Sequence, residues 1–154
     1  MTAARCSGAE ARGARVAAAA RGWLGTPYRH QASARGAGAD CLGLVRGVWR
    51  EVIGPEPEAP PAYSPDWSEA ARDERLWAAM GRWCAPVAVA RAEVGDVLLF
   101  RMRAAGVAKH LGIVTACGPD GLRMIHAHAG RCVAEAAVGP AWLRRCAAAF
   151  RFPE

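Results

Sequence analysis

The pattern of hydrophobic and polar positions divides the chain into a helical first half and a strand-rich second half. Apolar residues recur every three or four positions over two segments, which predicts helices at Ala9–Leu24 and Cys41–Ile53. A third helix is predicted from Ser64-Pro65 to about Cys84, with the proline in its first turn. In the second half the apolar residues form short runs separated by glycine-containing turns, which is typical of β-strands.

Five strands and one short helix are predicted in this second half. The helix covers Pro140–Arg145, and the strands cover Val94–Arg103, Ala108–Ala116, Leu122–Ala129, Cys132–Ala136 and Ala147–Phe152. Helices followed by an antiparallel meander predict an α+β fold, in which the helix that begins at Cys41 packs on an antiparallel sheet. The length of 154 residues fits one domain, so residues 1–154 are interpreted as a single domain.

Capping residues mark the ends of the first two predicted helices, and apolar residues mark their buried faces. Gly25 is a stop for the first helix, Asp40 is an N-cap for the second, and Gly54 ends it. The buried face of the first helix is predicted to carry Val16, Ala20, Trp23 and Leu24. The buried face of the second is predicted to carry Leu44, Val45, Val48, Trp49 and Val52.

Two segments rich in glycine or proline are predicted to be loops. Gly25–Ala39 carries four such residues and is expected to be irregular. Pro55–Pro65 contains five prolines and is interpreted as a connecting loop rather than a domain boundary. We expect Tyr63 and Trp67 to anchor this loop to the body of the protein.

The composition argues against several classes of protein. The net charge of +6 comes from scattered arginines, with Lys109 as the only lysine, so dedicated nucleic-acid binding is not expected. No stretch approaches the ~20 apolar residues of a membrane span, and the N-terminal segment lacks the apolar run of a signal peptide, so export by that route is not expected. The six cysteines are widely spaced and form no Cys-x-x-Cys pair. We therefore interpret all of them except Cys41 as free thiols buried in the core. We expect no cofactor.

Cys41 is the candidate nucleophile because it stands first in a predicted helix, directly after Asp40. The unpaired N–H groups and the positive dipole end of a helix start lower the pKa of a thiol and so favour the thiolate. The N–H of Cys41 itself is suited to stabilise an oxyanion formed on an attacked carbonyl. A small buried core residue is the alternative interpretation of this position taken alone.

Histidines supply the candidates for a base. His110 lies at the start of a predicted strand, and an imidazole can accept the thiol proton and return it to a leaving amine. His126 and His128 are two positions apart on another predicted strand and so point to the same face. We expect His126 to fix the tautomer of His110 through a hydrogen bond, while His128 either lines the pocket or is exposed. A metal site formed by this pair with Cys132 or Cys41 is disfavoured because no carboxylate or second cysteine stands at ligand spacing.

The loop before the predicted Cys41 helix carries candidate substrate contacts. The Tyr28 hydroxyl can donate to an oxyanion or to a peptide carbonyl, although taken alone it is more simply a loop aromatic packed on the core. His30 and Gln31 are polar and close to the same opening. Asp40 has two compatible roles, as the helix cap and as a carboxylate for a substrate ammonium group.

Five segments resemble, in order, the NlpC-type papain-like cell-wall peptidases. They are Gly25-Thr26-Pro27-Tyr28, Asp40-Cys41-x-Gly43-Leu44-Val45, Gly95-Asp96-x-Leu98-x-Phe100, His110-x-Gly112-Ile113 and Ile125-His126-Ala127. Three longer segments, Tyr28–Ser33, Asp40–Glu51 and Ala149–Pro153, resemble the subgroup encoded with phage tails and gene transfer agents. The similarity covers essentially the whole chain after about Val16.

The resemblance implies a papain-like α+β fold with a Cys–His–His triad at Cys41, His110 and His126. It also implies cleavage of peptidoglycan stem peptides, typically between D-glutamate and meso-diaminopimelate, with Tyr28 and Asp40 in the substrate site. Two departures bear on substrate preference. Leu42 replaces a serine that is common in relatives, and His30-Gln31 replaces a usual glycine pair.

The resemblance further implies a place in a particle. The chain would be made in the bacterial cytoplasm, assembled with tail hub or baseplate proteins of a phage-like tail, and act on the cell wall of the recipient. The alternatives are a structural tail-tip component with a silent site and a papain-like amidase or acyltransferase. The intact set of Cys41, His110 and His126 favours the peptidase, because packing alone does not require these residue types.

Overall fold

The computed structural model describes residues 8–61, 63, 73–128 and 130–154. Its helices within these segments are α1 (Gly8–Arg21), α2 (Cys41–Val52), α3 (Arg75–Trp83) and α4 (Pro140–Arg145), with a 3-10 turn, η1, at Val89–Arg91. A small two-stranded sheet consists of β1 (Ser33–Ala34) and β2 (Gly38–Ala39). The main sheet consists of β3 (Ala85–Val87), β4 (Val97–Arg101), β5 (Ala108–Gly118), β6 (Gly121–His126), β7 (Ala134–Ala137) and β8 (Cys146–Arg151).

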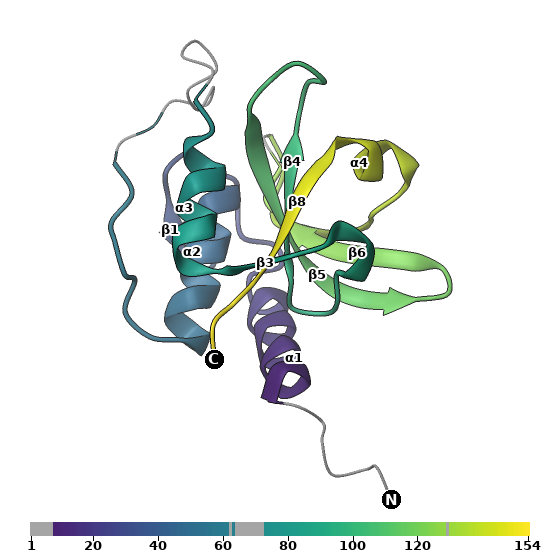
Figure 1. Cartoon of the computed structure of the whole chain (residues 1–154). Coiled ribbons are helices and arrows are strands. Elements are labelled where there is room, and N and C mark those ends of the chain that lie inside the picture. The colour runs from purple at the N-terminus through teal and green to yellow at the C-terminus, as the bar shows by residue number, and fades with distance from the viewer. Residues whose placement is uncertain (1–7, 62, 64–72, 129) are drawn as a thin grey trace, which may run out of the picture.

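The strands of the main sheet follow the order β3-β8-β4-β5-β6-β7, and every neighbouring pair is antiparallel. β4 to β7 form the meander that the sequence predicts. The last strand, β8, crosses back to lie between β3 and β4 (Figure 1). The predicted α+β fold, with helices packed on an antiparallel sheet, is therefore confirmed.

Both faces of the sheet are covered, and this explains why β4 is apolar along most of its length. Successive side chains of a strand point to opposite faces. Val97 and Leu99 belong to the core cluster shared with α1, α2 and α3, whereas Leu98 and Phe100 belong to a second cluster against which Trp142 of α4 packs. All four of these strand residues are fully buried, as expected for a strand that is covered on both sides.

The boundaries of α2 follow from its own sequence. Asp40 is the N-cap, and its Oδ1 accepts a hydrogen bond from the Gly43 N–H at 2.7 Å. Leu44, Val45 and Val48 are buried against the sheet, whereas the remaining members of the predicted stripe, Trp49 and Val52, are half-buried. The predicted helix is correct to within one residue at each end.

Several predicted elements differ in extent from those observed. α3 begins at Arg75, while its predicted start at Ser64-Pro65 and the predicted anchor Trp67 lie outside the described residues. The loop expected to be irregular contains β1 and β2, and β3 and η1 were not predicted. β6 ends at His126, so His128 lies beyond the strand, and β7 begins two residues after Cys132.

The burial of three residues also corrects the sequence analysis. Leu24 is 45% exposed because α1 ends at Arg21 and the chain turns before residue 24. Cys117 and Cys132 are exposed free thiols, whereas Cys84 is buried as predicted. Cys117 lies at the outer end of the β5–β6 hairpin and Cys132 lies in a loop, so neither reaches the core.

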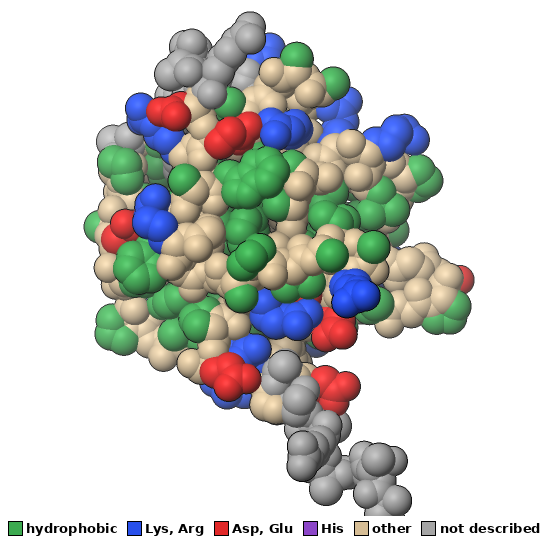
Figure 2. Space-filling model, in the orientation of Figure 1, with side chains coloured by type: hydrophobic (Ala, Val, Ile, Leu, Met, Phe, Trp, Pro, Cys, Tyr) green, Lys and Arg blue, Asp and Glu red, His purple; other side chains and the backbone are tan. Residues whose placement is uncertain are grey.

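Charged side chains of both signs are scattered over the face of the molecule shown in Figure 2, with hydrophobic side chains between them. Across the described part of the chain, no helix is both long enough and apolar enough to cross a membrane.

α2 lies so close to Trp23 that position 47 has no room for a side chain. A Cβ on Gly47 would lie 1.9 Å from Cζ2 of Trp23, which is itself fully buried. The indole Nε1 of Trp23 donates to Glu51 Oε1 at 3.1 Å, so the ring is held in place from the next turn of α2.

We therefore expect Gly47→Ala to lower the free energy of unfolding by roughly 1–3 kcal/mol, the usual cost of overpacking a core. Gly81→Ala is the matched control, because Gly81 lies in α3 with open space around its Cα. This control should stabilise the protein by up to about 1 kcal/mol through helix propensity. Urea denaturation of both variants measures the difference, and equal effects would contradict the close packing at Gly47.

Candidate active site

Cys41 begins α2 and lies against the start of β5. Its Sγ is 3.6 Å from the carbonyl oxygen of Lys109, the residue that precedes His110. The thiol is 9% exposed, so it sits below the surface. In this arrangement its hydrogen bond goes to the backbone of β5, beside His110, rather than to an imidazole ring.

The environment of Cys41 favours the neutral thiol. Burial, and after it the nearby carboxylate of Asp40, raise the pKa of the thiol to about 12. The N–H groups of Leu111, Leu42 and Cys41 lower this pKa, but by less. The helix start thus acts in the predicted direction, but the predicted net depression of the pKa is wrong because desolvation and the carboxylate outweigh it.

Three imidazole rings meet where β5 begins and β6 ends. Nε2 of His110 and Nδ1 of His126 are 2.8 Å apart, so one nitrogen donates and the other accepts. The ring centroid of His128 lies 5.6 Å from that of His110 and 5.9 Å from that of His126. Although His128 lies outside the strand, the structure brings all three predicted histidines together.

Burial keeps two of these rings neutral. His110 and His126 are 6% and 7% exposed. Desolvation, followed by the charge of the neighbouring imidazoles, lowers the pKa of His110 to about 3 and that of His126 to about 4. At neutral pH the resting site therefore combines a neutral thiol with neutral imidazoles.

Trp142 is a neighbour of the histidines that the sequence analysis missed. It lies in α4, and its indole contacts the rings of His110, His126 and His128. The sequence predicted the short helix, but its residues carried no signal of a role in the site.

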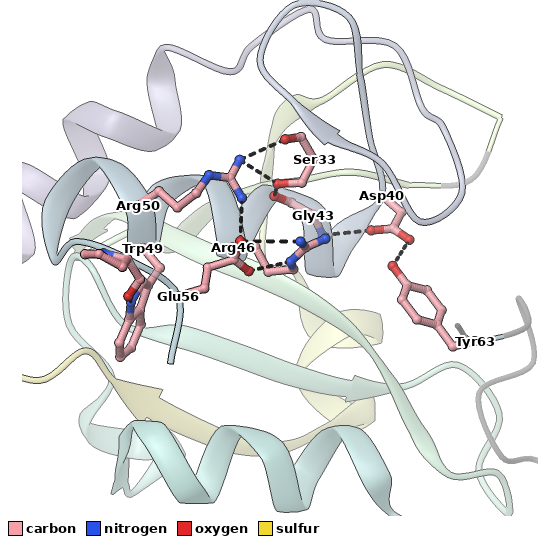
Figure 3. A network of polar contacts seen from close by, with 9 residues as sticks. Ser33, Asp40, Gly43, Arg46, Trp49, Arg50, Glu56 and Tyr63 are labelled. Atoms are coloured by element: carbon pink, nitrogen blue, oxygen red, sulfur yellow. Dashed lines mark hydrogen bonds and ion pairs between the residues drawn. The ribbon is translucent and has the colours of Figure 1, made fainter. Parts of the chain in front are cut away.

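Asp40 connects the candidate substrate residues. Its Oδ2 accepts hydrogen bonds from the Gln31 N–H, at 2.7 Å, and from the Tyr63 hydroxyl, and it lies 3.9 Å from Nδ1 of His30. The carbonyl oxygen of Tyr63 accepts from His30 Nε2 at 2.7 Å and from the side-chain amide of Gln31. The structure thus brings His30, Gln31 and Asp40 together, as predicted. It adds Tyr63, which had been assigned only an anchoring role and whose hydroxyl points to Asp40 in Figure 3.

Gln31 stands where the resemblance expects a glycine, and its backbone conformation is one that favours glycine. Gln31 has a φ of 64°, a left-handed conformation that glycine adopts more readily than other residues. Its N–H and its side-chain amide are both hydrogen-bonded, to Asp40 and to Tyr63. These contacts stabilise a conformation that would otherwise favour the usual glycine.

Tyr28 lies close to the same group. It is half-buried and forms an isolated β-bridge with Ala39. Burial raises the pKa of its hydroxyl, and electrostatic interaction with Cys41 and Asp40 raises this pKa further.

Glu56 ties the segment after α2 to the helix itself. Its carboxylate accepts from Arg46 Nε at 2.6 Å and from Arg50 Nη1 at 3.0 Å. Arg50 also donates to the carbonyl oxygen of Ser33 at 2.8 Å, and the Ser33 hydroxyl donates to the carbonyl oxygen of Gly43 at 2.6 Å. Figure 3 shows this network, which fixes the loop of β1 against α2 on the side of Asp40.

The described residues contain no group of three histidine, cysteine, aspartate or glutamate side chains arranged to hold a metal ion.

Comparison with solved structures identifies similar folds. The NlpC/p60 domain of the peptidoglycan hydrolase SagA is 25% identical, with a TM-score of 0.59, over 91% of this chain and 98% of that one. The peptidoglycan hydrolase RipB from Mycobacterium tuberculosis is 21% identical, with a TM-score of 0.57, over 95% of this chain and 67% of that one. An NlpC/P60 family protein from Bacillus cereus is 20% identical, with a TM-score of 0.61, over 91% of this chain, and this chain spans 40% of its length. A search of curated proteins found no match.

These similarities define a papain-like α+β fold of the cysteine peptidase type. The sequence profile of the NlpC/P60 family matches residues 25–151. The chain belongs to the NlpC/P60 family and is a hydrolase of its cysteine peptidase type.

The lowered pKa values of His110 and His126 predict that acid destabilises the protein. Below pH 6.5 the unfolded chain binds protons on both histidines, whereas the native state does not. The free energy of unfolding therefore decreases as the pH falls below 6.5. The decrease continues to about pH 4 for His126 and about pH 3 for His110. The expected slope is about 1.4 kcal/mol per pH unit for each histidine.

Urea denaturation between pH 7 and pH 4.5 measures this slope. His126→Asn should reduce it by about 1.4 kcal/mol per pH unit, whereas Leu143→Ala, at an exposed position of α4, should leave it unchanged. Parallel pH profiles for wild type and His126→Asn would show that His126 is not held neutral by the fold.

Proposed function

We propose that this chain is a cysteine endopeptidase that cuts the stem peptides of peptidoglycan, between D-glutamate and meso-diaminopimelate. Two proteins of similar fold, SagA and RipB, are described as peptidoglycan hydrolases, which supports this class of substrate. The observation that carries the proposal is the 2.8 Å contact between His110 Nε2 and His126 Nδ1, on the strand against which the Cys41 thiol lies. The three residues act within one catalytic domain.

The tautomer of His110 decides whether it can act as a base. If its Nε2–H donates to Nδ1 of His126, then Nδ1 of His110 carries a free lone pair for the thiol proton. His126 can accept this hydrogen bond both before and after His110 becomes charged, and the bond is stronger once its donor is ionised. A neutral His126 is therefore suited to orient His110 without adding a charge.

The reaction then follows from these positions. Cys41 exchanges its Lys109 partner for His110, Sγ attacks the peptide carbonyl, and the thiol proton passes to Nδ1 of His110. The N–H of Cys41 at the start of α2 and the hydroxyl of Tyr28 stabilise the oxyanion. The C–N bond breaks as His110 returns the proton to the leaving amine, and water activated by His110 hydrolyses the thioester.

In the resting site Cys41 and His110 do not form a thiolate–imidazolium ion pair. The raised pKa of Cys41 and the lowered pKa of His110 both favour the neutral forms. Charge therefore develops on the thiol and the imidazole during the attack itself, when the substrate has displaced water from the site.

The substrate amine is assigned to Asp40. Its carboxylate is buried, and its Oδ2 is occupied by the Tyr63 hydroxyl and the Gln31 N–H. A substrate ammonium group would join or replace the Tyr63 hydroxyl at this oxygen. His30, Gln31 and His128 complete the proposed substrate contacts around Asp40 and His110.

The setting of the enzyme is proposed from sequence resemblance alone. The segments Tyr28–Ser33, Asp40–Glu51 and Ala149–Pro153 resemble the subgroup carried by phage tails and gene transfer agents. In this setting tail hub or baseplate proteins are the partners, and the recipient cell wall is the site of action.

Digestion of purified meso-diaminopimelate-type peptidoglycan tests the reaction. Wild type should release fragments cut after D-glutamate, identified by mass spectrometry, and Cys41→Ala should release none because no other group supplies the nucleophile. Cys117→Ala is the matched control, since Cys117 is an exposed thiol at the far end of β5. Equal cleavage by Cys41→Ala and wild type would exclude the thiol mechanism.

Asp40→Asn tests the proposed amine contact while keeping an oxygen for the helix cap. We expect the KM for a stem-peptide fragment with a free N-terminal amine to rise about tenfold or more, because an ion-paired hydrogen bond is replaced by a neutral one. The KM for the same fragment with an acetylated amine should change little. Equal changes for the two fragments would place the amine elsewhere.

A further inference from the structure

The ring of His110 has a neighbour on one face that the catalytic scheme does not use. The Trp142 indole is stacked on it, with centroids 5.4 Å apart and planes at 25°. The same indole meets His126 at 90°, with centroids 5.3 Å apart, and meets Phe100 edge-on at 5.0 Å. Trp142 therefore touches both members of the His110–His126 hydrogen-bonded pair and the residue that pairs with His110 across the sheet.

The position of Trp142 is itself held on several sides. Pro140 opens α4, and Gly139 accepts a backbone hydrogen bond from Leu143 at 3.0 Å. Arg145, at the end of the helix, donates to the carbonyl oxygen of Met102 beyond β4. These contacts fix α4 against the end of β4, so the indole cannot move freely away from His110.

A stacked indole restricts an imidazole in two ways. It blocks a flip of the ring about χ2, which would put Cδ2 in the place of Nδ1 and Cε1 in the place of Nε2. Its π face also attracts an imidazolium more than a neutral ring. His110 needs both effects, because its Nε2 must stay on His126 while its Nδ1 receives a proton. His126 and His128 are the titratable groups that contact His110 from β6 and the following loop, and Cys41 approaches from α2.

We propose that Trp142 is a positioning residue for the peptidase reaction: by stacking on His110 it fixes the ring in the orientation that keeps Nε2 on His126 and presents Nδ1 to the nucleophile. This role rests on the proposed catalytic function of His110. Trp142 acts through His110, on whose ring it is stacked.

The test compares Trp142→Phe, which keeps an aromatic face, with Trp142→Leu, which keeps apolar volume without one. Leu143→Ala, on the same helix and 46% exposed, is the matched control. Kinetics on a stem-peptide fragment separate kcat from KM. NMR of the full-length protein with ¹⁵N-labelled histidine reports independently on the tautomer and ring exchange of His110.

We expect Trp142→Leu to lower kcat about tenfold with KM unchanged, and Trp142→Phe to stay within about threefold of wild type. The NMR spectrum should show one His110 tautomer, protonated at Nε2, in wild type and Trp142→Phe, and a mixture in Trp142→Leu. If Trp142→Leu fails to fold, Trp142→Met replaces it.

A Trp142→Leu protein with the kcat and the single tautomer of Trp142→Phe would overturn the proposal, because Trp142 would then be a packing residue. A wild-type protein that cleaves no peptidoglycan would instead overturn the proposed function. The NMR comparison would still decide whether Trp142 positions His110, so the two failures are distinguishable.

Discussion

The carboxylate of Asp40 is the interaction on which the site depends. One of its oxygens caps α2 and so sets the position of Cys41, and the other holds the loop at Gln31 and the hydroxyl of Tyr63. A buried carboxylate is costly unless its lone pairs are satisfied, and here three donors from separate segments satisfy it. The same charge raises the pKa of the thiol beside it. Asp40 thus both positions Cys41, the proposed nucleophile, and favours the neutral form of its thiol.

Cys41 and the neighbouring histidines His110 and His126 are all uncharged in the resting site. A helix start favours a thiolate, but in this chain burial and Asp40 prevail. The histidines are likewise held neutral by burial. Because the thiolate rather than the thiol is the nucleophile, the proposed reaction requires the proton to leave Cys41 during the attack itself.

Much of the fold could be predicted because its signals are local. The cap at Asp40, the apolar stripe of α2 and the short helix at Pro140 each depend on neighbouring residues, and each was predicted nearly to the residue. The insertion of β8 between β3 and β4, the approach of Tyr63 to Asp40 and the stacking of Trp142 on His110 join distant parts of the chain. No periodicity encodes these contacts. The pKa of Cys41 was misjudged for the same reason, since desolvation depends on what the whole fold places around a group.

The place of β8 in the sheet has a consequence for how the molecule is made. β8 lies between β3 and β4, although both of these strands leave the ribosome more than 40 residues earlier. Among the described residues β3 pairs with β8 alone, so the edges of β3 and β4 that face β8 stay unpaired until Cys146–Arg151 has been made. Pairings between strands so far apart in the chain form late, because loop closure must precede them. The nascent chain therefore exposes an unpaired edge of β4 until β8 is made, and an unpaired strand edge is a feature that favours aggregation.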